Sequence, residues 1–106
     1  MTEQSYVTKA LPVSIKFYIP RTEGFMDVVK DIVSQYGSMS LIEFDGYFEG
    51  KFEPVKYTRV EVHTTRINEK NIIQYANGVR IKLEQKSLAL EFNNKLILVR
   101  ETEITP

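Results

Sequence analysis

The chain has 106 residues, of which 42% are hydrophobic and 26% charged, values typical of one small soluble domain. Lysine plus arginine number 14 and aspartate plus glutamate also number 14, so no overall field attracts nucleic acid or an acidic membrane. The absence of cysteine excludes disulfides, thiolate metal sites and cysteine nucleophiles. No apolar run reaches the ~18 residues of a membrane span and the N-terminus lacks the apolar core of a signal peptide, so we expect a cytoplasmic protein with no membrane contact.

The chain contains no repeat and no linker, so we expect a single domain over residues 10–100 with flexible, polar termini at 1–9 and 101–106. The first predicted element is a strand with one buried face, which ends at Pro20. Its apolar residues alternate with polar ones: Val13, Ile15, Phe17 and Ile19 against Ser14, Lys16 and Tyr18.

A helix is predicted next, with Thr22 as its N-terminal cap and Gly37 as the left-handed residue that ends it. The apolar residues of this segment recur at helical spacing: Phe25, Val28, Val29, Ile32, Val33 and Tyr36.

Two strands follow, at residues 38–45 and 55–64, and we expect residues 46–54 to connect them because two glycines punctuate that segment. Ile42 and Phe44 alternate with Leu41 and Glu43 in the first of these strands. In the second, one face carries Lys56, Thr58, Val60 and Val62, and the other carries Tyr57, Arg59, Glu61 and His63.

Residues 69–84 support two predictions. Ile72, Ala76, Val79 and Leu83 form one helical stripe that Thr65 or Asn68 could cap, whereas Asn77-Gly78 is a strong hairpin signal. The helix is favoured, because glycine inside a helix costs only ~1 kcal/mol. Two further strands, at residues 87–92 and 95–100, are predicted to join at Asn93-Asn94.

This order of elements predicts an α+β fold, a ferredoxin-like βαββαβ sandwich with an extra C-terminal strand. Both helices would cover one sheet face and leave the other face open. The open face is expected to be solvated, covered by another copy of the chain, or used to bind a ligand.

Tyrosine and histidine residues predicted on the open face bear on function. Tyr18 and Tyr57 could stack RNA bases, but the segment around Tyr57 lacks the glycine-aromatic pattern of RNA-recognition strands, so nucleic acid is a disfavoured partner. His63 is the single histidine, and we expect an ordinary strand residue rather than an acid or base. No phosphate loop, metal-binding histidine pair or nucleophile motif occurs, so we expect no metal and no cofactor.

The predicted connection at residues 46–54 is unusually aromatic and acidic, with Tyr47, Phe48, Phe52, Glu49 and Glu53 beside its glycines. One interpretation is that the rings fill a gap or pack on a neighbouring subunit. The other is a pocket in which rings sandwich a planar group and a carboxylate meets a cation.

The order from Tyr36-Gly37-Ser38 through Asp45-Gly46-Tyr47-Phe48 and Glu53 to Gln85 resembles two groups of short proteins. One group is small ferredoxin-like bacterial proteins of unknown function. The other is the phage-encoded S-adenosylmethionine lyases, which cleave their substrate to methylthioadenosine and homoserine lactone. The resemblance spans residues 11–99.

The resemblance to the lyases implies a homo-oligomer, with a trimer favoured, and a substrate site between subunits in the host cytoplasm. It implies that Tyr47 and Glu53 are catalytic, with Glu61 matching the acidic position only if the register slips. Substrate-binding positions are then expected at Phe48, Phe52, Tyr57 and Glu61.

The sequence therefore favours an inter-subunit small-molecule site, with S-adenosylmethionine as the candidate substrate. A non-enzymatic module that binds or inhibits another protein is the alternative, and RNA binding on the sheet face is the third.

Overall fold

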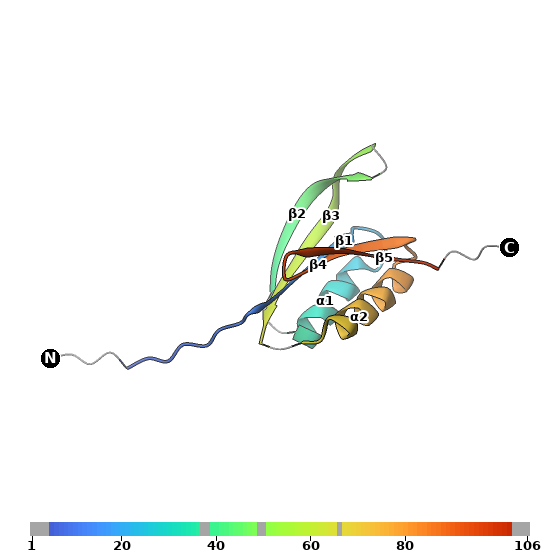
Figure 1. Ribbon diagram of the computed structural model, residues 1–106. Helices are drawn as coiled ribbons and strands as arrows, with labels where there is room; N and C mark the ends of the chain where they lie inside the picture. Colours follow the sequence, from blue (N-terminus) through green and yellow to red (C-terminus); the bar gives the residue numbers. More distant parts are fainter. Residues whose placement is uncertain (1–4, 37–38, 49–50, 66, 103–106) are drawn as a thin grey trace.

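The computed structural model describes residues 5–36, 39–48, 51–65 and 67–102, and for residues 39–48 and 51–55 it describes the backbone alone. Its strands form one antiparallel sheet in the order β2-β3-β1-β4-β5, and Figure 1 shows both helices side by side on one face of that sheet. This confirms the ferredoxin-like α+β prediction with its extra C-terminal strand. The elements are β1 (Val13–Pro20), α1 (Phe25–Tyr36), β2 (Met39–Phe48), β3 (Lys51–Thr64), α2 (Glu69–Lys82), β4 (Ser87–Phe92) and β5 (Lys95–Arg100).

The core lies between the helices and the three central strands. The predicted alternation of β1 is confirmed, since its four inward residues are buried while the polar residues between them are half-buried on the open face. Inward residues of β3 and β4 flank them, and burial of these side chains supplies the main driving force for folding. The fully covered side chains include Ile15, Phe17, Ile19, Ile32, Val60, Val62, Ile72 and Leu90.

Helix α1 begins at Phe25, so the prediction that Thr22 caps it is wrong. The Phe25 N–H donates to the Thr22 carbonyl at 3.1 Å and closes a turn, while the Val28 N–H donates to the Gly24 carbonyl at 3.2 Å. Gly24 has φ +89°, a backbone conformation that glycine adopts without steric cost and that turns the chain into the helix. The predicted end at Gly37 lies outside the described residues.

Residues 69–82 form a helix, so the hairpin alternative at Asn77-Gly78 is wrong. Asn68 has extended backbone angles and its side chain accepts a hydrogen bond from the Lys70 N–H at 2.7 Å, which makes it the N-terminal cap. The helical stripe predicted from Ile72 to Leu83 is buried against the sheet. Burial of that whole stripe outweighs the local turn preference of two residues.

Gly78→Ala is expected to stabilise the domain by about 0.5–1 kcal/mol, because alanine restricts the unfolded chain and favours the helix. A Cβ atom at this position would meet nothing within 4 Å. Urea unfolding followed by circular dichroism measures the change. An unchanged or lowered midpoint would contradict this expectation.

The two C-terminal strands join as predicted. Asn93 and Asn94 have φ values of 49° and 69°, the left-handed pair that a two-residue hairpin turn requires. The Asn93 side chain also accepts a hydrogen bond from the Ser14 N–H at 2.9 Å, which ties this turn to the start of β1.

In the segment predicted as a connection, residues 46–48 and 51–54 are strand instead. β2 continues to Phe48 and β3 begins at Lys51, so the two strands form a hairpin that extends beyond the rest of the sheet in Figure 1. Aromatic residues favour extended backbone, and here they outweigh the glycines that suggested a loop. The ladder shifts register between Phe44 and Gly46, so the glycine marks an irregularity rather than the end of a strand.

Three aromatic rings pack together where β1 meets both helices. The ring centroids of Phe17 and Tyr75 are 5.9 Å apart and those of Tyr36 and Tyr75 are 5.5 Å apart, both edge-to-face. The Tyr75 hydroxyl donates a hydrogen bond of 2.5 Å to Asp31. Burial raises the pKa of Tyr75 above its ordinary value, and the Asp31 carboxylate raises it further; the pKa of Tyr36 is raised by the same two causes.

The free energy of unfolding is expected to be constant near neutral pH and to fall above pH ~10. Unfolded tyrosines ionise at that pH, whereas Tyr75 in the folded chain keeps its proton to higher pH, so alkali favours the unfolded state. Urea titrations at pH 8, 10 and 11 measure this, with Tyr6→Phe as control because Tyr6 is exposed. Tyr75→Phe should flatten the alkaline decline, and an equally steep decline in that variant would contradict the assignment.

Candidate functional site

The tip of the β2–β3 hairpin places the two predicted catalytic residues on adjacent rungs of the ladder. Tyr47 pairs with Phe52, and Glu53 pairs with Gly46 on the next rung. Phe48 pairs with Lys51 at the end of the hairpin. Three of the four predicted aromatic site residues, Tyr47, Phe48 and Phe52, therefore lie on adjacent rungs. The side chains of these positions lie outside the described part of the structure.

This tip has no neighbouring strand among the described residues, because β1 pairs with β3 only over residues 57–64. A two-stranded ribbon is marginally stable in water when nothing covers it. The aromatic content of the tip therefore favours contact with another molecule over free exposure to solvent.

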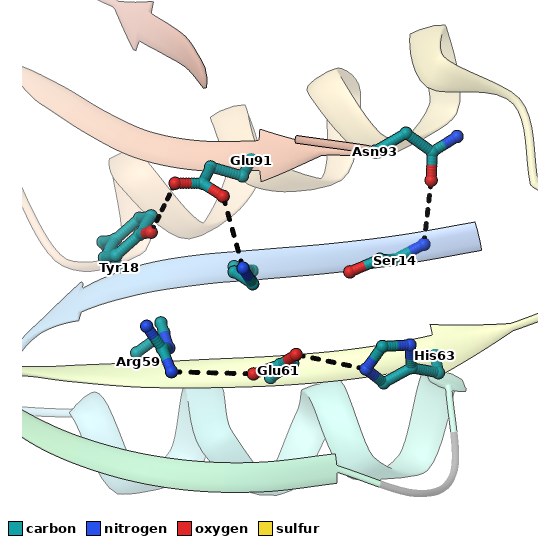
Figure 2. A network of polar contacts seen from close by, with 8 residues as sticks. Ser14, Tyr18, Arg59, Glu61, His63, Glu91 and Asn93 are labelled. Atoms are coloured by element: carbon teal, nitrogen blue, oxygen red, sulfur yellow. Dashed lines mark hydrogen bonds and ion pairs between the residues drawn. The ribbon is translucent and has the colours of Figure 1, made fainter. Parts of the chain in front are cut away.

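A second polar group lies on the open face of the central strands, and Figure 2 labels Tyr18, Arg59, Glu61, His63 and Glu91 of this group. Glu91 of β4 accepts a hydrogen bond of 2.7 Å from the Tyr18 hydroxyl and lies 3.5 Å from the Lys16 ammonium. On β3, Glu61 lies 3.1 Å from His63 Nε2 and 3.7 Å from the Arg59 guanidinium. We call these six residues the open-face network.

Both acids of the open-face network are already paired with cations, so the network is close to neutral. Burial raises the pKa of the Tyr18 hydroxyl, the bond to Glu91 raises it further, and the nearby Arg59 partly lowers it. Tyr18 is therefore a proton donor to Glu91 at neutral pH and is poorly suited to act as a base. The arrangement orders the sheet face but offers no unpaired carboxylate for catalysis.

The structure separates the predicted site residues into two places. Tyr57 pairs with Phe44 at the base of the hairpin and is half-buried, whereas Glu61 belongs to the open-face network. At about 3.3 Å per residue, Glu61 lies about 13 Å along β3 from Tyr57 and roughly twice that distance from Glu53. Glu53 is thus the acid that shares the hairpin tip with Tyr47, and Glu61 is not.

His63 is an exposed strand residue hydrogen-bonded to Glu61. That placement agrees with the prediction of an ordinary strand residue. Glu91 and its pairing with Tyr18 and Lys16 were not predicted. The available signal was the alternation of residues 87–92, which puts Ser87, Ala89 and Glu91 on the face opposite to Leu88 and Leu90.

The described residues hold no group of three or more acidic or histidine side chains placed to bind a metal ion. In the same part of the chain, neither helix combines the length and the hydropathy that a membrane crossing requires.

Comparison with known proteins gives two structural matches. No protein-family model matches the chain, and no curated protein matches it. A structure of a phage SAM lyase in complex with S-methyl-5'-thioadenosine is similar over 93% of this chain and 97% of that one, with a TM-score of 0.65 and 13% sequence identity. A phage SAM lyase in the apo state is similar over 94% of this chain and 100% of that one, with a TM-score of 0.59 and 13% identity. At this identity the matches establish the shared fold.

Proposed function

We propose that the chain is an S-adenosylmethionine lyase that acts as a homo-oligomer, with a trimer favoured, and that its site lies between subunits at the tip of the β2–β3 hairpin. The observation that carries the proposal is the similarity of nearly the whole chain, end to end, to two phage SAM lyases. An aromatic, acid-bearing hairpin tip without a neighbouring strand in the described chain supports the position of the site. S-adenosylmethionine is a cytoplasmic metabolite, so we place the reaction in the cytoplasm, that of the host if the chain is phage-encoded.

The reaction needs little from side chains. The substrate carboxylate oxygen attacks the γ-carbon of its own methionine moiety, the bond from that carbon to the sulfonium breaks, and sulfur leaves with the electron pair as a neutral thioether. The products are methylthioadenosine and homoserine lactone, and no proton changes hands. A site that folds the methionine chain into the reactive geometry and excludes water from the carboxylate accelerates this step.

Each predicted residue has a role that follows from its chemistry. The ring face of Tyr47 can stabilise the positive charge near sulfur, and its hydroxyl can position the substrate through a hydrogen bond. Glu53 can fix the substrate ammonium or the ribose hydroxyls. Phe48 and Phe52 each supply a ring that can stack on the adenine, and Tyr57 lies at the base of the same hairpin. Glu61 is left to the open-face network, since its carboxylate already contacts Arg59 and His63.

The register of the β2–β3 ladder favours a site that is shared between two copies of the chain. Tyr47 and Glu53 occupy adjacent rungs, and adjacent rungs of a hairpin present opposite faces. One hairpin inserted between subunits would then contribute Tyr47 to one site and Glu53 to the next. Each complete site would combine the two residues from different copies.

Co-expression of Tyr47→Phe chains with Glu53→Gln chains is expected to restore part of the activity that each variant lacks alone. In randomly mixed oligomers about one quarter of the sites would combine an intact Tyr47 with an intact Glu53 from another copy. The measurement compares methylthioadenosine formed by the mixed oligomers with that formed by each variant alone. No restoration would place both residues of a site on one chain.

The proposed activity is tested by incubating purified protein with S-adenosylmethionine and quantifying methylthioadenosine by mass spectrometry. A sample without protein corrects for slow spontaneous decay. Protein-dependent product is the expected result. Absence of product, together with no thermal stabilisation by S-adenosylmethionine or methylthioadenosine, would overturn the proposal and favour the protein-binding module.

A further inference from the structure

Strand β5 has a free edge and an apolar centre. It is the last strand of the sheet, and among the described residues no strand pairs with its outer side. Leu96 and Leu98 are 61% and 58% exposed on the open face, while Ile97 and Val99 face the helices. Charged residues, the usual protection of an edge strand against pairing, occur only at its two ends, Lys95 and Arg100.

We infer that β5 pairs antiparallel with β5 of a second copy around a two-fold axis at Leu98, which joins two sheets into one. The inference is independent of the proposed lyase activity. It is carried by the backbone register of β5 and by the charges at its two ends.

The register of β5 permits this pairing. The Glu101 N–H donates to the Lys86 carbonyl at 2.9 Å, so Lys95, Ile97, Val99 and Glu101 direct their backbone groups toward β4. Leu96, Leu98 and Arg100 consequently direct theirs toward the free edge. A two-fold axis at Leu98 pairs Leu98 with Leu98 and Leu96 with Arg100, so every outward backbone group meets an outward group of the second copy.

The charges select the same register. With the axis at Leu98, Lys95 lies opposite Glu101 of the second copy, and symmetry repeats the pair at the other end of the strand. Moving the axis to Ile97 puts Lys95 opposite Val99 and brings Asn94, which has φ 69°, into the ladder. Lys95 already contacts Glu69 of α2, so Glu101 would join an existing ion pair.

The side chains fit the arrangement on both faces. The exposed leucines of the open face would meet across the axis, and on the helix face Ile97 would meet Val99. Within one copy, Leu90 pairs with Ile97 and Leu88 pairs with Val99. The contacts between copies extend this apolar layer. Isologous contacts of this kind close after two copies.

The chain contains no cysteine, so single cysteines test the register directly. Leu98→Cys should form a disulfide between copies under mild oxidation, because the Cα atoms of a hydrogen-bonded antiparallel pair lie about 5.5 Å apart, within disulfide range. Leu96→Cys is the matched control. It lies on the same face with similar exposure, but its two copies would be about 13 Å apart along the strands and should not cross-link.

Native mass measurement gives a second readout. The wild-type mass should be an even multiple of the chain mass, a dimer or, with the proposed three-fold assembly, a hexamer. Leu98→Lys should halve it, while Ile81→Lys, at an equally exposed position on α2, should not. A monomeric or odd-numbered wild type, or equal cross-linking of the two cysteine variants, would overturn the inference. Loss of lyase activity alone changes neither readout, so the two proposals can fail separately.

Discussion

Glu53→Gln and Tyr47→Phe are each expected to lower kcat/KM for S-adenosylmethionine by about 10- to 100-fold, the cost of losing one charge-assisted hydrogen bond or one positioning contact. Both replacements keep the size of the side chain, so the oligomer should remain intact. Initial rates of methylthioadenosine formation, with the mass of the assembly measured in parallel, give the result.

Two comparisons make this prediction decisive. Glu23→Gln and Tyr6→Phe apply the same chemical changes at exposed positions away from the hairpin and should leave the rate unchanged. Glu61→Gln separates the two candidate acids: loss of activity there, with Glu53→Gln fully active, would move the acid to the open-face network. Disassembly in both hairpin variants would show that the tip is structural.

Phe17→Ala is expected to lower the free energy of unfolding by about 3–5 kcal/mol, a large part of the ~5–15 kcal/mol that stabilises a small domain. Phe17 is fully buried at the centre of β1 and its ring contacts Tyr36 and Tyr75. Because strands and helices surround Phe17, the structure can relax only partly into the cavity that the substitution would leave.

Urea unfolding at neutral pH measures this loss. Val33→Ala on α1 is the control, because Val33 is 39% exposed and its truncation opens no enclosed cavity. Similar losses in the two variants would contradict the position assigned to Phe17 at the centre of the core.

The sequence predicted most of the fold because its elements have clear periods. The alternation of residues 13–20 and the stripe of Ile72, Ala76 and Val79 follow from burial on one face, and the structure buries those residues. The prediction failed where glycines that indicate a turn lie within a longer stretch of strand pairing. Glycines suggested a loop at residues 46–54, but pairing between two aromatic strands continues through most of that segment.

The open-face network could be predicted only in part. The alternation of β1 and β3 put Lys16, Tyr18, Tyr57, Arg59, Glu61 and His63 on one face. The structure joins five of them in the open-face network: Lys16, Tyr18, Arg59, Glu61 and His63. The partner of Tyr18 was not predictable, because Glu91 lies 73 residues away in the sequence and meets Tyr18 only through the β1–β4 register. The sheet topology, rather than the local sequence pattern, decides which residues of different strands meet.

The proposed chemistry explains why the sequence carries no familiar catalytic motif. An intramolecular displacement of a thioether needs no general base, nucleophilic side chain or metal, so it requires no residue spacing that a motif search would detect. What it requires is shape and a few positioned contacts at the hairpin tip.

Mass spectrometry of both products formed by the protein from S-adenosylmethionine in ¹⁸O-labelled water distinguishes a lyase from a hydrolase. We expect methylthioadenosine together with homoserine lactone that carries no label when first formed, because the attacking oxygen belongs to the substrate carboxylate. First-formed homoserine with label at its hydroxyl would show hydrolysis by water instead. No protein-dependent product at all would contradict the assignment of a lyase.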